Sequence, residues 1–125
     1  MPRVLVIDDD EDLRTLIKAM LVGVGHRVEE ATDGAEGLRA FGKHAPDLVL
    51  TDISMPGLDG HEVISALRVA NAEVPIIAVS GGSAVAKDEL LLEAARLGAV
   101  EVIMKPFEFE QLVGAVNRAL SGLTR

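Results

Sequence analysis

A chain of 125 residues has room for one domain, and a domain of this size buries enough apolar surface to fold without disulfides. A net charge of −8 and an aromatic content of only 2% argue against direct nucleic-acid binding, which needs a basic face and stacking platforms. The absence of Cys excludes disulfides and thiolate metal sites.

The start of the chain lacks the long apolar stretch and cleavage pattern of a secretory signal. Its apolar runs are also too short to span a bilayer. The lack of Cys fits a reducing compartment. We therefore expect a cytoplasmic protein that is not inserted in a membrane.

Five short segments along the chain have the composition of β-strands. Most are continuous apolar runs, which is typical of strands buried on both faces, and the second is weaker and edge-like. In chain order the predicted strands are "VLVID" (4–8), "HRVEEA" (26–31), "DLVLTD" (47–52), "VPIIAVSGG" (74–82) and "VEVIMKP" (100–106).

Each predicted strand is followed by a segment whose apolar residues recur at helical spacing. The first of these helices is expected to end at Gly23 and Gly25, and the fourth at Gly98. The glycines of "DGAEGLRAF" make the second helix marginal. The residues predicted to face inward are Leu13, Leu16, Ile17, Met20 and Leu21; Leu38 and Phe41; Val63, Ile64 and Leu67; Leu90, Ala94 and Leu97; and Phe109, Leu112, Val113, Val116 and Leu120.

The strand–helix unit repeats five times with short connections, which predicts an α/β fold with a doubly wound five-stranded parallel sheet and helices on both faces. No linker, repeat or low-complexity segment interrupts the pattern. We expect residues 1–125 to form a single domain.

Polar residues stand where the predicted strands end, and in an open parallel sheet this edge is where ligands bind. They are Asp8, Asp9 and Asp10 after the first strand, Asp52 after the third, Ser80, Gly81 and Gly82 after the fourth, and Lys105 and Pro106 after the fifth. If these strands are adjacent, several carboxylates, a hydroxyl and an ammonium face one small volume.

That combination of groups has a chemical logic. Clustered carboxylates suit a hard divalent cation such as Mg²⁺, with Mn²⁺ as an alternative, and the cation neutralises charges that otherwise repel. A nearby Lys and Ser can hold a phosphoryl group, and a carboxylate nucleophile can accept it as an aspartyl phosphate.

Four motifs, in this order and spacing, resemble the receiver domain of two-component response regulators: "VLVIDDDEDLR", "PDLVLTDISMPGLDG", "IIAVSGG" and "VIMKPF". The resemblance covers essentially the whole chain. It implies a flavodoxin-like (βα)5 fold with strand order 2-1-3-4-5. It also implies a phosphohistidine donor on a sensor histidine kinase or histidine phosphotransferase, and a downstream protein effector or output domain.

The resemblance implies roles for the acidic residues. Asp52 matches the phosphoacceptor, and Asp8 and Asp9 match the acidic pair that holds Mg²⁺ together with Asp52 and the backbone carbonyl of Ser54. On this interpretation the domain catalyses only its own phosphorylation and slow dephosphorylation, so we do not expect an enzyme that acts on other substrates.

The resemblance also implies roles for the residues that hold and sense the phosphoryl group. Ser80 matches the switch hydroxyl, the Gly81 amide is a further donor, and Lys105 matches the lysine that pairs with a phosphoryl oxygen, followed by a typically cis bond to Pro106. An aromatic residue often stands three positions before that lysine, where this chain has Val102. We therefore expect the switching motion to lie mainly in the backbone of residues 81–87.

Several other residues that could bind a ligand are expected to have ordinary structural roles instead. Asp10 is expected to cap the first helix, with Asp12 favoured by the helix dipole. His26, His44 and His61 lack ligand spacing, and Met55 and Met104 are expected to pack rather than act.

Three other functions remain open at this point. A binding-only receiver-like adaptor is disfavoured because every acceptor-site residue type is present. A phosphatase of the haloacid-dehalogenase type also uses an Asp nucleophile, but it needs a second Asp where this chain has Ser54. A flavin-binding flavodoxin needs a Ser/Thr/Gly-rich loop after the first strand, and here that loop is acidic.

Overall fold

The computed structural model describes residues 2–53, 60–71, 73–80, 92, 95–96 and 98–122. Within these ranges five parallel strands form one sheet in the order β2-β1-β3-β4-β5, which confirms the predicted doubly wound, flavodoxin-like fold. The strands are β1 (Arg3–Ile7), β2 (Arg27–Ala31), β3 (Leu48–Asp52), β4 (Ile76–Ser80) and β5 (Glu101–Met104).

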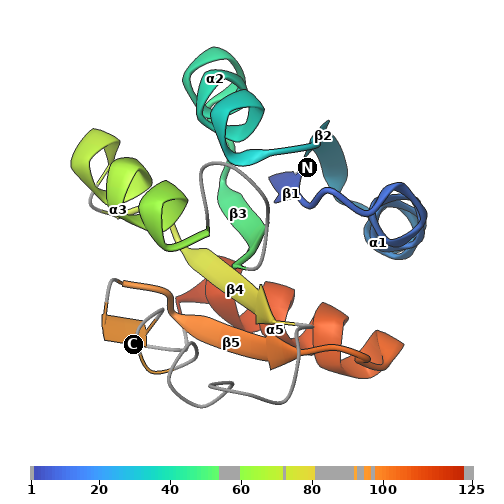
Figure 1. Ribbon diagram of the computed structural model, residues 1–125. Coiled ribbons are helices and arrows are strands. Elements are labelled where there is room, and N and C mark those ends of the chain that lie inside the picture. The colour runs from blue at the N-terminus through green and yellow to red at the C-terminus, as the bar shows by residue number, and fades with distance from the viewer. Residues whose placement is uncertain are drawn as a thin grey trace.

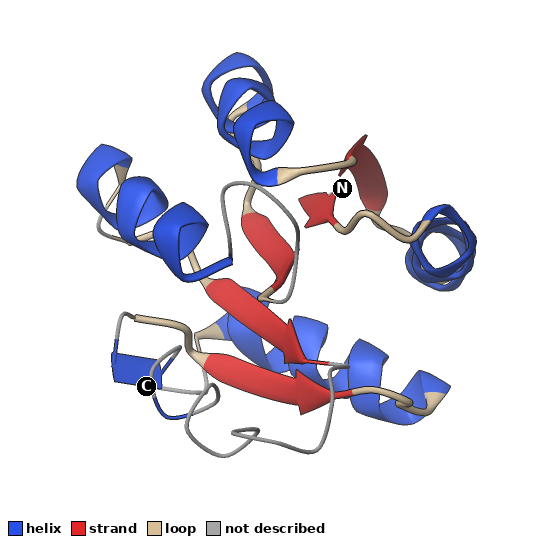
Figure 2. Ribbon diagram, in the orientation of Figure 1, coloured by secondary structure: helices blue, strands red, loops and turns tan. Residues whose placement is uncertain are grey.

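Helices cover both faces of the sheet (Figure 1). Those in the described residues are α1 (Glu11–Gly23), α2 (Gly34–His44), α3 (Gly60–Ala70) and α5 (Phe109–Ser121). Helices α1 and α5 pack on one face, while α2 and α3 pack on the other, so the sheet is the middle of three layers (Figure 2). No helix in the described part of the chain has the length and apolar character to cross a bilayer.

The strands are continuous apolar runs because both of their faces are buried. In β1, Val4 and Val6 join the core cluster beneath α1 and α5, whereas Leu5 and Ile7 join the cluster beneath α2 and α3. Alternate residues of a strand point to opposite faces, so each central strand contributes to both cores. The edge strand β2 has exposed positions, as its weaker sequence pattern predicts.

The predicted local signals lie where the helices begin and end. Asp10 is the N-cap of α1, and its side chain accepts a hydrogen bond from the Leu13 amide at 3.1 Å. Helix α1 ends at Gly23, and Gly25 follows with a φ of 96°, a left-handed conformation that glycine adopts readily.

Two predicted core positions are wrong. Leu16 is 48% exposed and Phe109 is 43% exposed. Helical spacing gives the direction of an apolar stripe but not its width, and both residues lie outside the face that contacts the sheet. On α5 the small residues Ala115 and Ala119 are buried instead. The predicted fourth helix, with Leu90, Ala94 and Leu97 inward, falls largely outside the described residues.

Candidate functional site

The carboxyl ends of β1 and β3 bring three carboxylates together. Ile7 pairs with Thr51, so the next residues, Asp8 and Asp52, lie next to each other at the end of the sheet. Asp8, Asp9 and Asp52 each offer an oxygen, and these three oxygens lie within 4.8 Å of one another. Asp8 is 2% exposed and Asp52 is 4% exposed, while Asp9 is open to solvent.

Lys105, just after β5, reaches into the same site. Its Nζ donates to Asp52 Oδ2 at 2.9 Å and to Asp8 Oδ2 at 3.1 Å. Its backbone amide donates to the Ser80 carbonyl at 2.7 Å, which fixes it beside the end of β4. The peptide bond between Lys105 and Pro106 is cis, as the family resemblance implies.

The described residues of this site carry more negative than positive charge. Lys105 pairs with Asp8 and Asp52, and an oxygen of Asp9 lies within 4.8 Å of an oxygen of each. Burial raises the pKa of Asp8, and the nearby Asp52 charge raises it further, against the lowering effects of the Asp10 amide and Lys105. Burial lowers the pKa of Lys105, but its bonds to Asp52 and Asp8 outweigh this and raise the pKa above its ordinary value.

The donor set fits a hard divalent cation. Mg²⁺ takes carboxylate oxygens together with waters and phosphate oxygens, and the convergent oxygens of Asp8, Asp9 and Asp52 provide the carboxylates. A cation there would also offset the repulsion among them. The carbonyl of Ser54, the further ligand implied by the resemblance, lies outside the described residues.

Ser80 ends β4 directly beside the carboxylates. Asp52 pairs with Val79, so Ser80 stands one residue further along the neighbouring strand. Its side chain is fully buried, and no hydrogen-bond partner for its Oγ is found in the described part of the chain. A buried hydroxyl without a partner is costly, which makes Ser80 a candidate to bind a ligand group. Gly81 and the rest of segment 81–87 lie outside the described residues.

A comparison with models of protein families identifies the family of this chain. The model of the response regulator receiver domain matches residues 4–117, which include every site residue described above. The chain belongs to the response regulator receiver domain family. This membership removes the phosphatase and flavodoxin alternatives.

Individual relatives of this receiver domain differ in length. It is 41% identical over 119 residues to the transcriptional regulatory protein PrrA of Mycobacterium tuberculosis, a match that covers 95% of this chain but 50% of PrrA. It is 34% identical over 120 residues to the chemotaxis protein CheY of Bacillus subtilis, which covers 95% of this chain and 98% of CheY. The chain thus spans about half the length of PrrA and nearly all of CheY.

Solved structures give the same result. The receiver domain of NtrX from Brucella abortus superposes with a TM-score of 0.88 at 34% identity, over 94% of this chain and 98% of that one. A receiver domain protein from Clostridium thermocellum has a TM-score of 0.90 at 30% identity, over 98% of this chain and 97% of that one. The similarity therefore covers the receiver domain as a whole.

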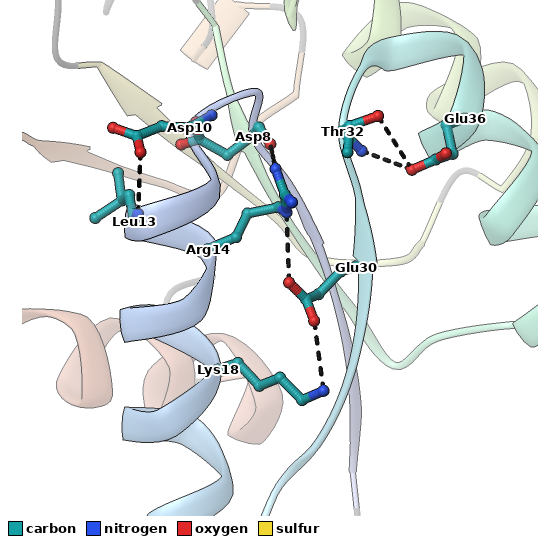
Figure 3. A network of polar contacts seen from close by, with 8 residues as sticks. All are labelled: Asp8, Asp10, Leu13, Arg14, Lys18, Glu30, Thr32 and Glu36. Carbon is teal, nitrogen blue, oxygen red and sulfur yellow. Dashed lines mark hydrogen bonds and ion pairs between the residues drawn. The ribbon is translucent and has the colours of Figure 1, made fainter.

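One residue of the site, Arg14, is not among those that the sequence motifs indicate. Arg14, on the first turns of α1, is 8% exposed, and its Nη1 donates to the backbone carbonyl of Asp8 at 2.8 Å (Figure 3). The signal in the sequence is an arginine that stands three positions before Ile17, on the helix face turned toward the sheet. Its partner is a backbone atom, which sequence patterns do not reveal.

Proposed function

We propose that this receiver domain accepts a phosphoryl group on Asp52 from the phosphohistidine of a sensor kinase or histidine phosphotransferase, with Mg²⁺ held by Asp8, Asp9 and Asp52. The observation that carries the proposal is the convergence of three carboxylate oxygens within 4.8 Å, with the Lys105 ammonium 2.9 Å from Asp52. This is an arrangement for binding positive charge and a phosphoryl group together.

The position of Asp52 favours it over Asp8 as the acceptor. Asp52 ends the central strand β3, between the acidic pair on β1 and the hydroxyl of Ser80 on β4. A group on Asp52 therefore has partners on both sides.

The transfer is a single displacement at phosphorus. An oxygen of the Asp52 carboxylate forms the new P–O bond while the P–N bond to the donor imidazole breaks, and the imidazole leaves with the electron pair and takes a proton. Mg²⁺ supplies positive charge against the phosphoryl oxygens when bound. On this proposal Lys105 donates to one of these oxygens, and the Ser80 hydroxyl, which has no partner among the described residues, donates to another.

On this proposal the domain catalyses reactions only on itself and passes its signal to another protein or to an output domain. The chemistry it catalyses is its own phosphorylation and slow dephosphorylation. Its effector is a separate protein or an output domain, since the chain matches about half of PrrA and nearly all of CheY. A cytoplasmic location and a switching motion in residues 81–87 stay predictions.

Intact mass spectrometry after incubation with acetyl phosphate and Mg²⁺ tests the proposal. We expect the wild type to gain one phosphoryl group that hydroxylamine removes, and Asp52→Asn to gain none. Asp12→Asn, which changes an exposed carboxylate on α1, is the matched control and should label like the wild type. Undiminished labelling of Asp52→Asn would disprove the assignment. A wild type that binds Mg²⁺ but never labels would instead favour the binding-only adaptor.

A further inference from the structure

The polar groups of Asp8 are held from four directions. Its backbone amide donates to the Ala31 carbonyl at 3.1 Å, and its backbone carbonyl accepts from Arg14 at 2.8 Å. Its carboxylate accepts from the Asp10 amide through Oδ1 and from Lys105 through Oδ2. Asp8 directly follows the last residue of β1, and the guanidinium of Arg14 satisfies its carbonyl.

The peptide that Arg14 contacts joins the two neighbouring carboxylates of the site. The carbonyl of Asp8 and the amide of Asp9 belong to one planar unit, so a donor that fixes the carbonyl also fixes where the Asp9 residue starts. The other peptide of Asp8 is fixed by Ala31. Together these two anchors set the directions in which the side chains of Asp8 and Asp9 leave the main chain.

Arg14 is itself held in place by the edge strand. Its Nε donates to Glu30 Oε1 on β2 at 3.4 Å, and the other oxygen of Glu30 lies 3.4 Å from Lys18 Nζ on α1 (Figure 3). The side chain of Arg14 is 9% exposed, whereas that of Lys18 is 49% exposed. A planar guanidinium can bond two partners in a fixed geometry, which an ammonium cannot do.

We propose that Arg14 is a positioning residue, which orients Asp8 and Asp9 for Mg²⁺ by holding the peptide between them, with Glu30 holding Arg14. The inference rests on the proposed function, because it assumes that these carboxylates bind the cation. Arg14 acts through the main chain and not as a ligand, since its Nη1 is committed to the Asp8 carbonyl. Partners of this kind affect metal affinity because they fix the ligand geometry.

A purely structural role for Arg14 makes a different prediction. If the guanidinium only satisfies a buried carbonyl, its removal lowers the free energy of unfolding by the same amount with and without Mg²⁺. If it positions the ligands, its removal also weakens the affinity of the folded protein for Mg²⁺. The stabilisation gained on adding Mg²⁺ then shrinks as well.

The experiment compares Arg14→Met with Lys18→Met. Both changes remove a cation from α1 that contacts Glu30, but only Arg14 contacts Asp8. Mg²⁺ dissociation constants are measured by NMR titration of backbone amides, and urea unfolding is followed with and without Mg²⁺. We expect Arg14→Met to bind Mg²⁺ roughly tenfold more weakly, Lys18→Met to bind like the wild type, and Arg14→Lys to fall between them.

Wild-type Mg²⁺ affinity in Arg14→Met would overturn the inference and leave the proposed function standing. If Arg14→Met does not fold, Glu30→Gln replaces it, because that change removes the charge that holds the guanidinium. Weaker Mg²⁺ binding in Glu30→Gln supports the inference, and unchanged binding overturns it. Absence of Mg²⁺ binding in the wild type would overturn both the inference and the proposed function.

Discussion

Charged side chains have different kinds of partner at the two ends of the sheet. Where the strands begin, Arg68 of α3 donates to the backbone carbonyls of Val74 at 2.6 Å and Gly98 at 2.8 Å, the residues that lead into β4 and β5. Where the strands end, the carboxylates of Asp8, Asp9 and Asp52 lie close together, and the Lys105 ammonium pairs with those of Asp8 and Asp52.

The charge of Arg68 stabilises the fold, whereas the carboxylates at the other end of the sheet are arranged to bind a ligand. Burial lowers the pKa of Arg68, yet its donors are satisfied by backbone oxygens that need partners. Burial likewise disfavours the ionised form of Asp8 and raises its pKa, and there the charge of the neighbouring Asp52 carboxylate raises the pKa further. Where the strands begin, the protein's own groups therefore compensate the buried charge. Where the strands end, negative charge is left that a cation can neutralise.

The largest effect on stability is expected at the end of the sheet where the strands begin. Arg68→Met leaves two part-buried carbonyls without their donor and should lower the free energy of unfolding by about 2 kcal/mol. Arg39→Met, which changes an exposed arginine on α2, should leave stability nearly unchanged. Urea unfolding measures both. Because Arg68 lies away from the carboxylates, Mg²⁺ affinity should stay at the wild-type value, and a large loss of affinity would break the separation between the two ends.

A smaller effect is expected from a pair of glycines on α2. A Cβ on Gly37 would come within 2.9 Å of Cγ1 of Ile7 and closer still to its Cδ1, whereas a Cβ on Gly42 would meet nothing within 4 Å. Gly37→Ala should therefore destabilise by about 1 kcal/mol, because overpacking costs roughly 1–3 kcal/mol and helix propensity returns about 1.

Gly42→Ala is the matched control for this change, and it should stabilise the protein by up to about 1 kcal/mol through helix propensity alone. Ile7 directly precedes Asp8, so Gly37→Ala should also perturb the amide signals of Asp8 and Asp9, whereas Gly42→Ala should not. Equal stability changes in the two variants would contradict the close packing of α2 on β1.

The order of residues along the chain predicts much of this. Apolar runs that end in acids indicated both the buried strands and the edge at which Asp8 and Asp52 meet, because register in a parallel sheet brings strand ends together. The helix pattern was less informative. The glycines of α2 suggested a marginal helix, although Gly37 is what allows the helix to approach Ile7. The spacing of Arg14 from Ile17 indicates a buried position, but the backbone carbonyl of Asp8 that Arg14 contacts leaves no signal in the sequence.

The smallest effect concerns pH in the absence of Mg²⁺. Since the pKa of Asp8 is raised above 3.8, the folded protein holds this proton more tightly than the unfolded chain. The stability that this group contributes is therefore present below pH 3.8 and lost as the pH rises through the raised value. Asp8→Asn should remove that component from the pH profile of urea unfolding. Identical profiles for the wild type and Asp8→Asn would contradict the raised pKa.

The central claim is that the carboxylates at the ends of the strands bind a divalent cation. The free energy of unfolding, measured with and without Mg²⁺, tests this claim most directly. At a Mg²⁺ concentration about tenfold above the dissociation constant, the wild type should gain about 1.4 kcal/mol. The double variant Asp8→Asn/Asp9→Asn should gain nothing. A wild type that Mg²⁺ does not stabilise, or a double variant that Mg²⁺ stabilises equally, would contradict the account.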